Sequence, residues 1–460
     1  MVWSIGLHAG ESVTEIVARQ TGSQESPLSK SRVLSAQNST AEVLQQFITQ
    51  HNITQISRVR ILTQLSHSII ASAHGTSPAV LTTLGFENWL ELCLPLKNNH
   101  FTTRPERISS YIDRELVFGA NERTNAQGHI EKILDEAELE FLVTKLSMHG
   151  IKNVAICFLH SQLNNENERR AKQFLENQGF KVFVSSNYAN DDEKSRFWTA
   201  ILNAYVEPLC NEKLSSLATT LQNYLTPEAD VKLGPHLFSE ILSGRISHLE
   251  AGFSLHNFLI ERFAKSAQLF YCGLEKFLLF KPTSQKKDTW SNSAFSLVVS
   301  HYDFIETKIQ PLTKLGKSFF CDLAFLNDKI AFDPGPMVLG RGMNLTVFDL
   351  LSLNSDFASI LGVAEKISER GQTRVRETLS AYSRHISEGS RITAEELLQN
   401  LLQMAVNSWR SELGHDLTGE SIVLCGPLAT SVQKLIGGKT IGDDFFAVSS
   451  LLVEDMDETS

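Results

Sequence analysis

Residues 333–349 read DPGPMVLGRGMNLTVFD. Proline fixes φ and glycine permits positive φ, so the DPGP run at 333–336 constrains the backbone to one conformation. The GRG run at 340–342 places an arginine between two glycines, and an acid follows a short apolar segment at 347–348. The segment therefore predicts a rigid turn joined to a glycine-flanked arginine, with an acid at the end of a short strand.

Size and charge limit the class of protein. The chain has 460 residues, enough for two or three domains that each bury a core. Its formal net charge of −10 argues against binding of nucleic acid, whose affinity rests largely on neutralised phosphates, but leaves a small nucleotide open. No apolar stretch approaches the roughly 20 residues that span a bilayer. We expect a protein that binds neither nucleic acid nor a membrane.

The cysteines and the N-terminus indicate the compartment. Six cysteines occur singly, without the spacing of a metal site. They predict reduced, mostly buried thiols, which are typical of a cytosolic protein. The first residues are predicted to form a strand at once. They lack the basic segment followed by an apolar segment that marks a signal peptide. We therefore expect a cytoplasmic location and no metal-binding cluster.

Strand and helix patterns alternate along the chain. The strands are predicted at 3–7, 14–19, 57–63, 79–83, 116–118, 153–159, 181–185 and 421–425, and the helices at 41–51, 66–73, 86–92, 135–149, 166–179, 191–217 and 393–412. This alternation predicts an α/β fold. The most polar segment, at 284–293, predicts a surface loop.

Five ordered motifs resemble those of the hydantoinase A/5-oxoprolinase family, which also includes the ATP-using subunits of acetone-type carboxylases. Residues 333–349 resemble the family's DPGP…GRG…T-x-T-D signature. The other four motifs lie at residues 82–91, 154–168, 193–208 and 425–428. They resemble TT-x-GF-x-D-x-LE, AVCLLHS…NP-x-HE, E-x-x-R-x-x-T-x-x-LNAY-x-x-P and GGAGPLH. Chance matches do not keep the family's order over nearly the whole chain.

The resemblance implies a sugar kinase/Hsp70/actin-like α/β fold, with two lobes built on related mixed sheets and ATP in the cleft between them. We expect an N-terminal hydantoinase/oxoprolinase-like lobe at residues 1–190, a hydantoinase A-like lobe at 191–453 and an acidic tail at 454–460. Catalytic family members typically continue into a further C-terminal domain, so the resemblance implies a shortened relative.

The family's first turn, IG-x-D-x-GGT-x-TD, corresponds to IGLHAGESVTE at residues 5–15. The resemblance implies that backbone and side chains of this turn bind nucleotide, and the candidates are Gly6, Gly10, Ser12 and Thr14.

Two substitutions change the chemistry of that turn. His8 replaces the family's first acid, and imidazole is a poor substitute for the oxygen ligands that Mg²⁺ prefers. Glu11 replaces a glycine, and one carboxylate–phosphate repulsion at about 4 Å amounts to roughly 4 kcal/mol at an effective dielectric of about 20. The last acid is replaced by Glu15, a mild change. We expect ATP and Mg²⁺ to bind weakly.

The other phosphate loops are also reduced. The second, expected after a strand near 268–271, retains only Gly273 and has no aspartate. The third is matched only by residues 315–318, with Gly316 as a nucleotide-binding candidate, and Gly426 is the candidate of the last motif. The segment at 62–68 keeps one threonine of the family's GTT-x-x-TNA pattern.

Asp349 and His8 are the catalytic candidates, and the resemblance places Asp333, Arg341 and Arg196 near substrate. Each also has a structural interpretation. His8 can be a packed side chain at a strand end, and Asp333 and Arg341 can stabilise their own turn. Arg196 can pair with the acid three residues before it on a helix and hold a lobe interface.

Three functions remain open. The first is ATP-dependent opening of a cyclic amide, such as a hydantoin or 5-oxoproline, with weak or lost nucleotide chemistry and a larger hydantoinase B-type or carboxylase-type partner subunit. The second is a pseudoenzyme, a two-lobed scaffold or regulatory subunit that binds a partner or a small metabolite. The third is an altered activity in which His8 acts as general base on a small-molecule ligand without nucleotide.

Overall fold

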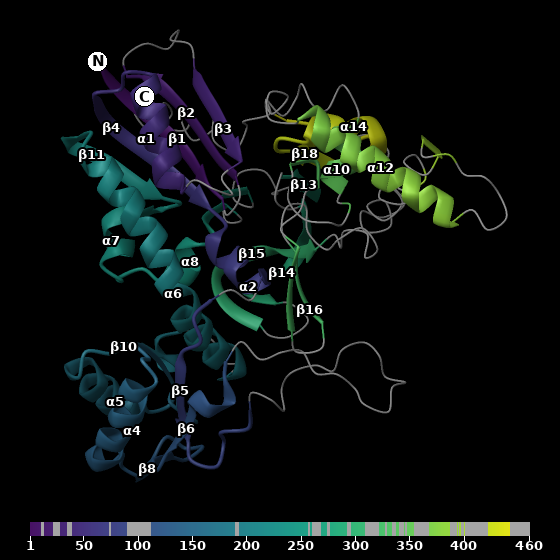
Figure 1. Cartoon of the computed structure of the whole chain (residues 1–460). Helices are drawn as coiled ribbons and strands as arrows, with labels where there is room; N and C mark the ends of the chain where they lie inside the picture. The colour runs from purple at the N-terminus through teal and green to yellow at the C-terminus, as the bar shows by residue number, and fades with distance from the viewer. Residues whose placement is uncertain are drawn as a thin grey trace.

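The computed structural model describes residues 1–10, 13–21, 28–34, 39–72, 75–89, 112–188, 193–255, 258–259, 268–273, 277–291, 296–308, 322–326, 329–333, 337–339, 345, 347–353, 368–386, 393, 395–396, 400 and 422–441. Figure 1 shows these residues arranged around three main sheets, with helices packed against them.

The first sheet has the strand order β12-β11-β4-β1-β2-β3. Its strands are β1 (Val2–Ala9), β2 (Val13–Gln20), β3 (Ser29–Leu34), β4 (Gln55–Thr63), β11 (Leu225–Leu233) and β12 (His236–Leu237). β1, β2 and β3 are successive antiparallel neighbours, whereas β4 runs parallel to both β1 and β11. Ile5 and Leu7 of β1 are fully buried, because α1 (Thr40–Gln50) and α6 (Glu193–Gln222) cover that face of the sheet.

The third sheet repeats this arrangement with the order β15-β14-β13-β18-β19. Its strands are β13 (Gln268–Cys272), β14 (Phe277–Ser291), β15 (Ser296–Lys308), β18 (Ile422–Cys425) and β19 (Lys439–Thr440). β13, β14 and β15 are antiparallel, and β18 runs parallel to β13 and β19. The first and third sheets therefore share one mixed topology, which confirms the predicted two-lobed fold with related sheets.

The second sheet is parallel and has the order β10-β9-β5-β6. Its strands are β5 (Ala79–Thr83), β6 (Val117–Ala120), β9 (Asn153–Cys157) and β10 (Lys181–Val184). All residues of β5 and β9 are buried, as expected for a parallel sheet with both faces covered. Alternate residues contact α4 (Glu136–Met148) and α5 (Glu166–Asn177) on one face and α6 (Glu193–Gln222) on the other.

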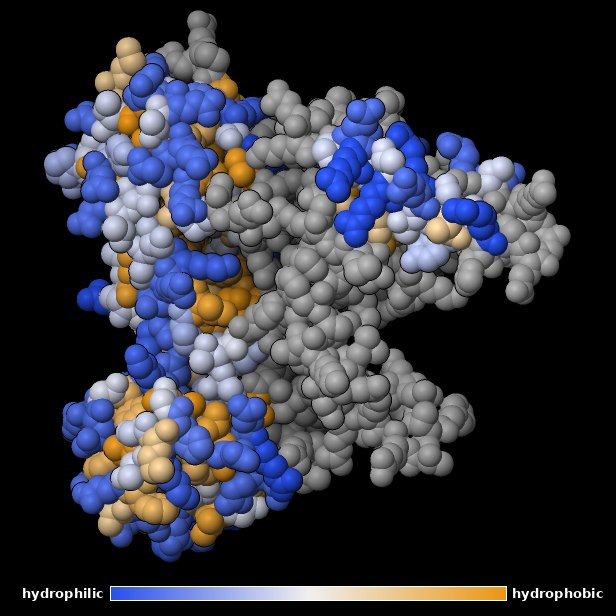
Figure 2. Space-filling model, viewed as in Figure 1, coloured by the Kyte–Doolittle hydropathy of each residue, from blue (hydrophilic) through white to orange (hydrophobic). Residues whose placement is uncertain are grey.

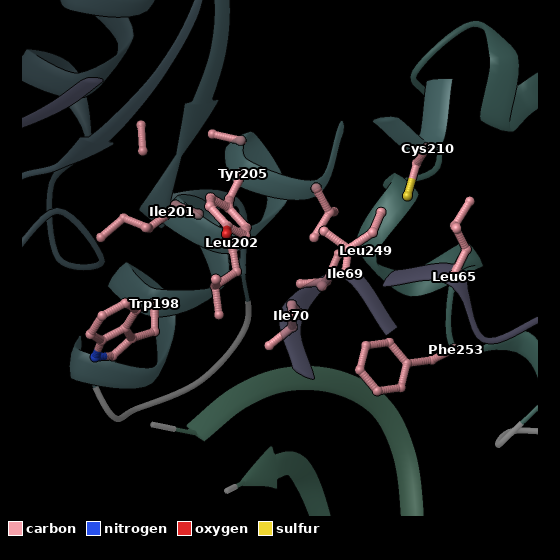
Figure 3. Close-up of a cluster of buried hydrophobic side chains, with 14 of the residues drawn as sticks. Leu65, Ile69, Ile70, Trp198, Ile201, Leu202, Tyr205, Cys210, Leu249 and Phe253 are labelled. Atoms are coloured by element: carbon pink, nitrogen blue, oxygen red, sulfur yellow. The ribbon is translucent and has the colours of Figure 1, made fainter. Parts of the chain in front are cut away.

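The long helix α6 joins the first two sheets. Its first half packs in one core cluster with α2 (Leu65–Ser72), α8 (His248–Ala251) and Phe253, as Figure 3 shows around Trp198 and Leu202. Its second half packs with α1 (Thr40–Gln50) beneath the first sheet. β11, which follows residue 190, completes that sheet, and the lobe boundary at residue 190 stays a prediction.

The remaining elements are short or peripheral. They are η1 (Arg114–Leu116), β7 (Arg123–Thr124), β8 (Ile130–Lys132), η2 (Ser185–Asn187), α7 (Phe238–Leu242), β16 (Asp322–Leu326), β17 (Lys329–Asp333), η3 (Met337–Leu339), α10 (Val347–Ser352), α12 (Glu369–Ile386) and α14 (Ala429–Ile436). Figure 2 shows hydrophilic residues gathered over α12. No helix within the described ranges is long and apolar enough to cross a bilayer.

One sequence expectation is wrong. The polar segment at 284–293 was predicted as a surface loop, but β14 continues through it to Ser291 and pairs with β15. Backbone pairing between two long antiparallel strands overrides the low strand propensity of its polar residues. The pairing register shifts twice in this part, between Pro282 and Lys287 and between Lys287 and Thr289. The predicted helix at 393–412 and the tail at 454–460 lie almost wholly or wholly outside the described residues.

Candidate functional site

A small cavity lies where the first and third sheets meet. It is lined from the first sheet and its flanking turns by His8, Val13, Glu15 and Gln64, and from the third sheet by Tyr271, Gly273 and Pro427. β1 and β4 are parallel, and so are β13 and β18, so the cavity lies at the carboxyl ends of two parallel pairs. Ligands of open α/β sheets bind outside such ends. The cavity is therefore the candidate functional site.

Three polar side chains form one row across the first sheet. The strand register places His8 of β1 opposite Glu15 of β2, and Glu15 opposite Arg32 of β3. Directly opposite residues on antiparallel strands lie on the same face and within reach of each other. His8 Nδ1 lies 3.4 Å from Glu15 Oε2, and Arg32 Nε donates to Glu15 Oε1 at 2.6 Å. We call these three residues the His8 row.

Charge compensation keeps Glu15 ionised although it is buried. Burial acts to raise the pKa of the Glu15 carboxyl, but the charge of Arg32 and the proximity of His8 outweigh it, and the pKa lies below its ordinary value. His8, Glu15 and Arg32 are 3%, 2% and 9% exposed, so solvent screens this interaction little. The row therefore places a fixed negative charge beside the Nδ1 edge of His8.

The other edge of the His8 ring has no such partner. Among the described residues, neither ring nitrogen of His8 makes a hydrogen bond although both are buried: Nδ1 has only the 3.4 Å contact with Glu15, and Nε2 lacks even that. Buried polar atoms are nearly always paired with protein or with ordered water. The cavity that His8 lines has a volume of about 10 Å³, which is about the space of one water molecule. The geometry thus leaves a small polar space beside an unpaired imidazole nitrogen.

The tight turn between β1 and β2 is set by its backbone. The Gly10 N–H donates to the Val13 carbonyl at 3.0 Å, and Thr14 Oγ1 donates to Thr40 Oγ1 at 3.3 Å. Gly6 lies inside β1, opposite Val17. Ser12 and Glu11, which the sequence singled out, lie outside the described residues, as does Gly316.

Gly426 directly follows β18 and packs against the end of β13. Its φ of 98° lies in the left-handed region, and a Cβ there would meet Tyr271 Cε2 at 2.9 Å and the Cys272 carbonyl at 3.0 Å. The Leu428 N–H donates to that carbonyl at 3.0 Å. Glycine is therefore required at the edge of the cavity for close packing as well as for conformation.

Asp349 has a structural environment. It is fully buried at the start of α10, and its two carboxylate oxygens accept the backbone N–H groups of Met337 at 3.1 Å and Val338 at 2.7 Å. These bonds hold the η3 turn that follows the DPGP run. Asp349 is not among the residues that line the cavity, and its catalytic role stays a prediction.

Arg196, one of the predicted substrate residues, does not line the cavity either. Arg196 is buried in α6 and lies 3.8 Å from Glu193, the i,i+3 contact that the sequence indicates. Glu193 in turn accepts the His160 N–H at 2.7 Å. Asp333 ends β17 opposite Asp322. Arg341 lies outside the described residues.

A magnesium ion does not fit the donor set of the described site. Mg²⁺ requires free oxygen ligands in near-octahedral geometry. Both oxygens of Glu15 contact Arg32 and His8, and both oxygens of Asp349 accept backbone N–H groups. In the described part of the chain no group of three or more His, Cys, Asp or Glu side chains could hold a metal ion.

Sequence reasoning missed three residues of the site. Arg32 follows Glu15 by a distance that carries no local signal, because only the register of β2 and β3 brings the two together. Gln64 and Tyr271 enter the cavity because two sheets from distant parts of the chain meet there. The motifs did indicate that the first turn, Gly273 and the residues next to Pro427 belong to one site.

The chain is similar to several known proteins. Residues 4–179 match the hydantoinase/oxoprolinase N-terminal region. An uncharacterized protein of Methanocaldococcus jannaschii is 28% identical over 148 residues, 32% of this chain and 22% of that protein. The acetophenone carboxylase gamma subunit of Aromatoleum aromaticum is 27% identical over 104 residues, 21% of this chain and 14% of that subunit. Each match therefore spans well under two thirds of the relative.

Two solved structures share the fold over almost the whole chain. A nucleotide-free acetone carboxylase, from work on ATP-dependent acetone carboxylation, has a TM-score of 0.67 at 14% identity and covers 97% of this chain and 69% of its own. The ATP-dependent caprolactamase of Pseudomonas jessenii has a TM-score of 0.62 at 17% identity and covers 95% and 68%. At such identities the likeness concerns the fold. The match over residues 4–179, together with the two related sheets, supports a hydantoinase/oxoprolinase-type family for this chain.

Proposed function

We propose that this protein is a hydantoinase/oxoprolinase-type hydrolase that opens a cyclic amide of the hydantoin or 5-oxoproline kind, with nucleotide chemistry weaker than that of its relatives. The observation that carries the proposal is the meeting of three family segments at one cavity. His8 of the first turn, Gly273 of the second loop and Pro427 of the last motif all line it. Both the caprolactamase and the acetone carboxylase with this fold are described as ATP-dependent, which supports a nucleotide-linked reaction.

ATP would bind through the backbone of the glycine turns at this meeting point. Glycines at Gly10, Gly273 and Gly426 allow close approach of a phosphate to backbone N–H groups. Bound ATP would supply a phosphoryl group that activates the amide carbonyl. The cavity of about 10 Å³ admits about one water, so a nucleotide requires the two sheets to separate there. That requirement, with the absence of a fitting magnesium site among the described residues, supports weak nucleotide chemistry.

We also propose a larger partner subunit and a cytoplasmic location for this protein. Similarity to a gamma subunit of acetophenone carboxylase supports assembly with a larger hydantoinase B-type or carboxylase-type subunit. Four cysteines, Cys157, Cys210, Cys272 and Cys425, are free and buried. Free thiols fit the reducing cytoplasm, which is the location we propose.

Two measurements test the function. Purified protein is incubated with ATP and, in turn, hydantoin, 5-oxoproline and a lactam, and ring opening is followed by mass spectrometry. Thermal shift is measured in parallel with millimolar ATP, because a ligand of the native state raises the melting temperature. We expect ring opening of at least one cyclic amide and a small, saturable shift with ATP.

The control and the partner are tested in the same series. The exposed variant Lys172→Gln, in an i,i+4 pair with Glu176, should leave both readouts unchanged. Turnover should rise when the larger subunit is co-expressed and co-purified. No ring opening with or without the larger subunit, and no ATP shift, would contradict the proposal and favour a non-catalytic scaffold.

A further inference from the structure

We propose that His8 is the general base that deprotonates a water molecule held in the cavity between the first and third sheets, in place of a metal-assisted acid. This inference rests on the proposed hydrolytic function and names the group that activates water for it.

The cavity has the size and polarity of a water site. Its volume of about 10 Å³ is close to the minimum for one buried water, which needs two to four polar partners. His8 contributes a ring nitrogen with no hydrogen bond among the described residues, and Gln64 contributes an amide side chain from beyond β4. Tyr271 and Gly273 close the space from the third sheet. A water bound there satisfies His8 Nε2, which would otherwise remain buried and unpaired.

The His8 row fixes which nitrogen of the ring carries the proton. Arg32 holds Glu15 as a carboxylate through a bond of 2.6 Å, and Glu15 Oε2 lies 3.4 Å from His8 Nδ1. A carboxylate beside one ring nitrogen favours the N–H form at that nitrogen. In its neutral form His8 would therefore place its proton on Nδ1, beside that carboxylate, and a lone pair on Nε2. The same carboxylate stabilises the imidazolium after proton transfer, the role of the third group in nucleophile–base–orienter arrangements.

Hydrolysis of the amide at His8 balances without a metal or a redox partner, and ATP, when bound, would activate the same carbonyl without changing this proton transfer. Once the two sheets separate to admit the cyclic amide, His8 Nε2 accepts one proton from the water as the water oxygen forms a bond to the amide carbonyl carbon. The C–N bond of the ring then breaks, its electron pair stays on nitrogen, and that nitrogen receives the proton from His8 Nε2. His8 returns to its neutral form, and the product is an open amino acid chain with one added water.

Substitution of the base should affect the chemical step. His8→Asn keeps a polar side chain but removes the base, and we expect kcat for ring opening to fall by about 10² to 10⁴-fold with little change in KM. The matched control is His236→Asn, because His236 also faces a carboxylate, Glu250 at 3.3 Å, but lies away from the cavity. That variant should retain wild-type kcat. Retained turnover in His8→Asn overturns the inference.

A second measurement needs neither substrate nor variant. Nitrogen NMR of histidine-labelled wild-type protein, with His8 assigned from its sequence neighbours, reports which ring nitrogen bears hydrogen in the neutral form. We expect the Nδ1–H form. Finding the Nε2–H form overturns the inference whatever the turnover. Absence of ring opening in wild type, with His8 in the Nδ1–H form, would instead contradict the proposed function alone.

Discussion

Glu15 lies opposite His8 on the adjacent strand, and its carboxylate reaches the Nδ1 edge of that imidazole at 3.4 Å while Arg32 binds its other oxygen at 2.6 Å. The family resemblance assigns the position of His8 to an acid that serves a metal-bound nucleotide. Here that position is a histidine, and Glu15, at the family's last acid, contacts both this histidine and Arg32.

Removing Arg32 should destabilise the protein strongly. Arg32→Met leaves the Glu15 carboxylate buried without its main cation, and breaking a buried pair in this way destabilises by about 3–5 kcal/mol. The double variant Glu15→Gln/Arg32→Met should recover most of that loss. Urea denaturation gives the free energies of unfolding. The exposed pair Arg169–Glu166 is the control, and Arg169→Met should change stability by less than about 1 kcal/mol. Equal effects at the two pairs would contradict the buried pairing.

His248 should make stability depend on pH. Burial lowers the pKa of His248 from 6.5 to about 4 in the folded protein. Between these two pKa values the unfolded chain therefore binds more protons than the folded protein. The contribution of neutral His248 to the free energy of unfolding is complete above pH 6.5 and is lost as the pH falls toward about 4. The slope for one group is at most about 1.4 kcal/mol per pH unit. Urea titrations of wild type and His248→Gln should converge as the pH falls through this window. A constant difference between them would show that His248 does not titrate there.

Gly426 should be intolerant of a side chain. Gly426→Ala combines a left-handed φ of 98° with a Cβ 2.9 Å from Tyr271 Cε2. Gly437 is the matched control, because its φ is 82° and a Cβ there meets nothing within 4 Å. Backbone strain alone destabilises by about 1–3 kcal/mol. We expect Gly437→Ala to fall in that range and Gly426→Ala to exceed it, as measured by chemical denaturation. A smaller effect at Gly426 would show that Tyr271 moves aside freely.

The core around α6 should carry much of the stability. Phe253 is fully buried in the cluster that Figure 3 shows. Its ring contacts the His67 ring at a centroid distance of 5.6 Å. Phe253→Ala should destabilise by about 3–5 kcal/mol through lost burial and the cavity left behind. Phe141, 65% exposed on α4, is the control, and Phe141→Ala should change stability by about 0.5 kcal/mol or less. Similar free energies of unfolding for the two variants would contradict this distribution of packing.

The sequence alone determined the α/β class, most element positions and the family resemblance. The apolar run that became β9 is buried on both faces, and the alternation around it specifies the parallel sheet. Such local patterns report burial and periodicity directly. The polar segment at 284–293 did not predict its strand, because the pairing of β14 with β15 depends on a partner strand and not on its own composition.

Only the tertiary structure decided the chemistry of the site. Sequence marked His8 as a departure from the family pattern, and a lone histidine at a strand end fits either packing or catalysis. The environment of His8 is set by Glu15 and Arg32, which lie in register with it across three strands. Tyr271 and Gly273, from a separate sheet, complete that environment. Pairing register and sheet contact are long-range properties, set by the burial of whole faces, so no local stretch of the chain could encode them by itself.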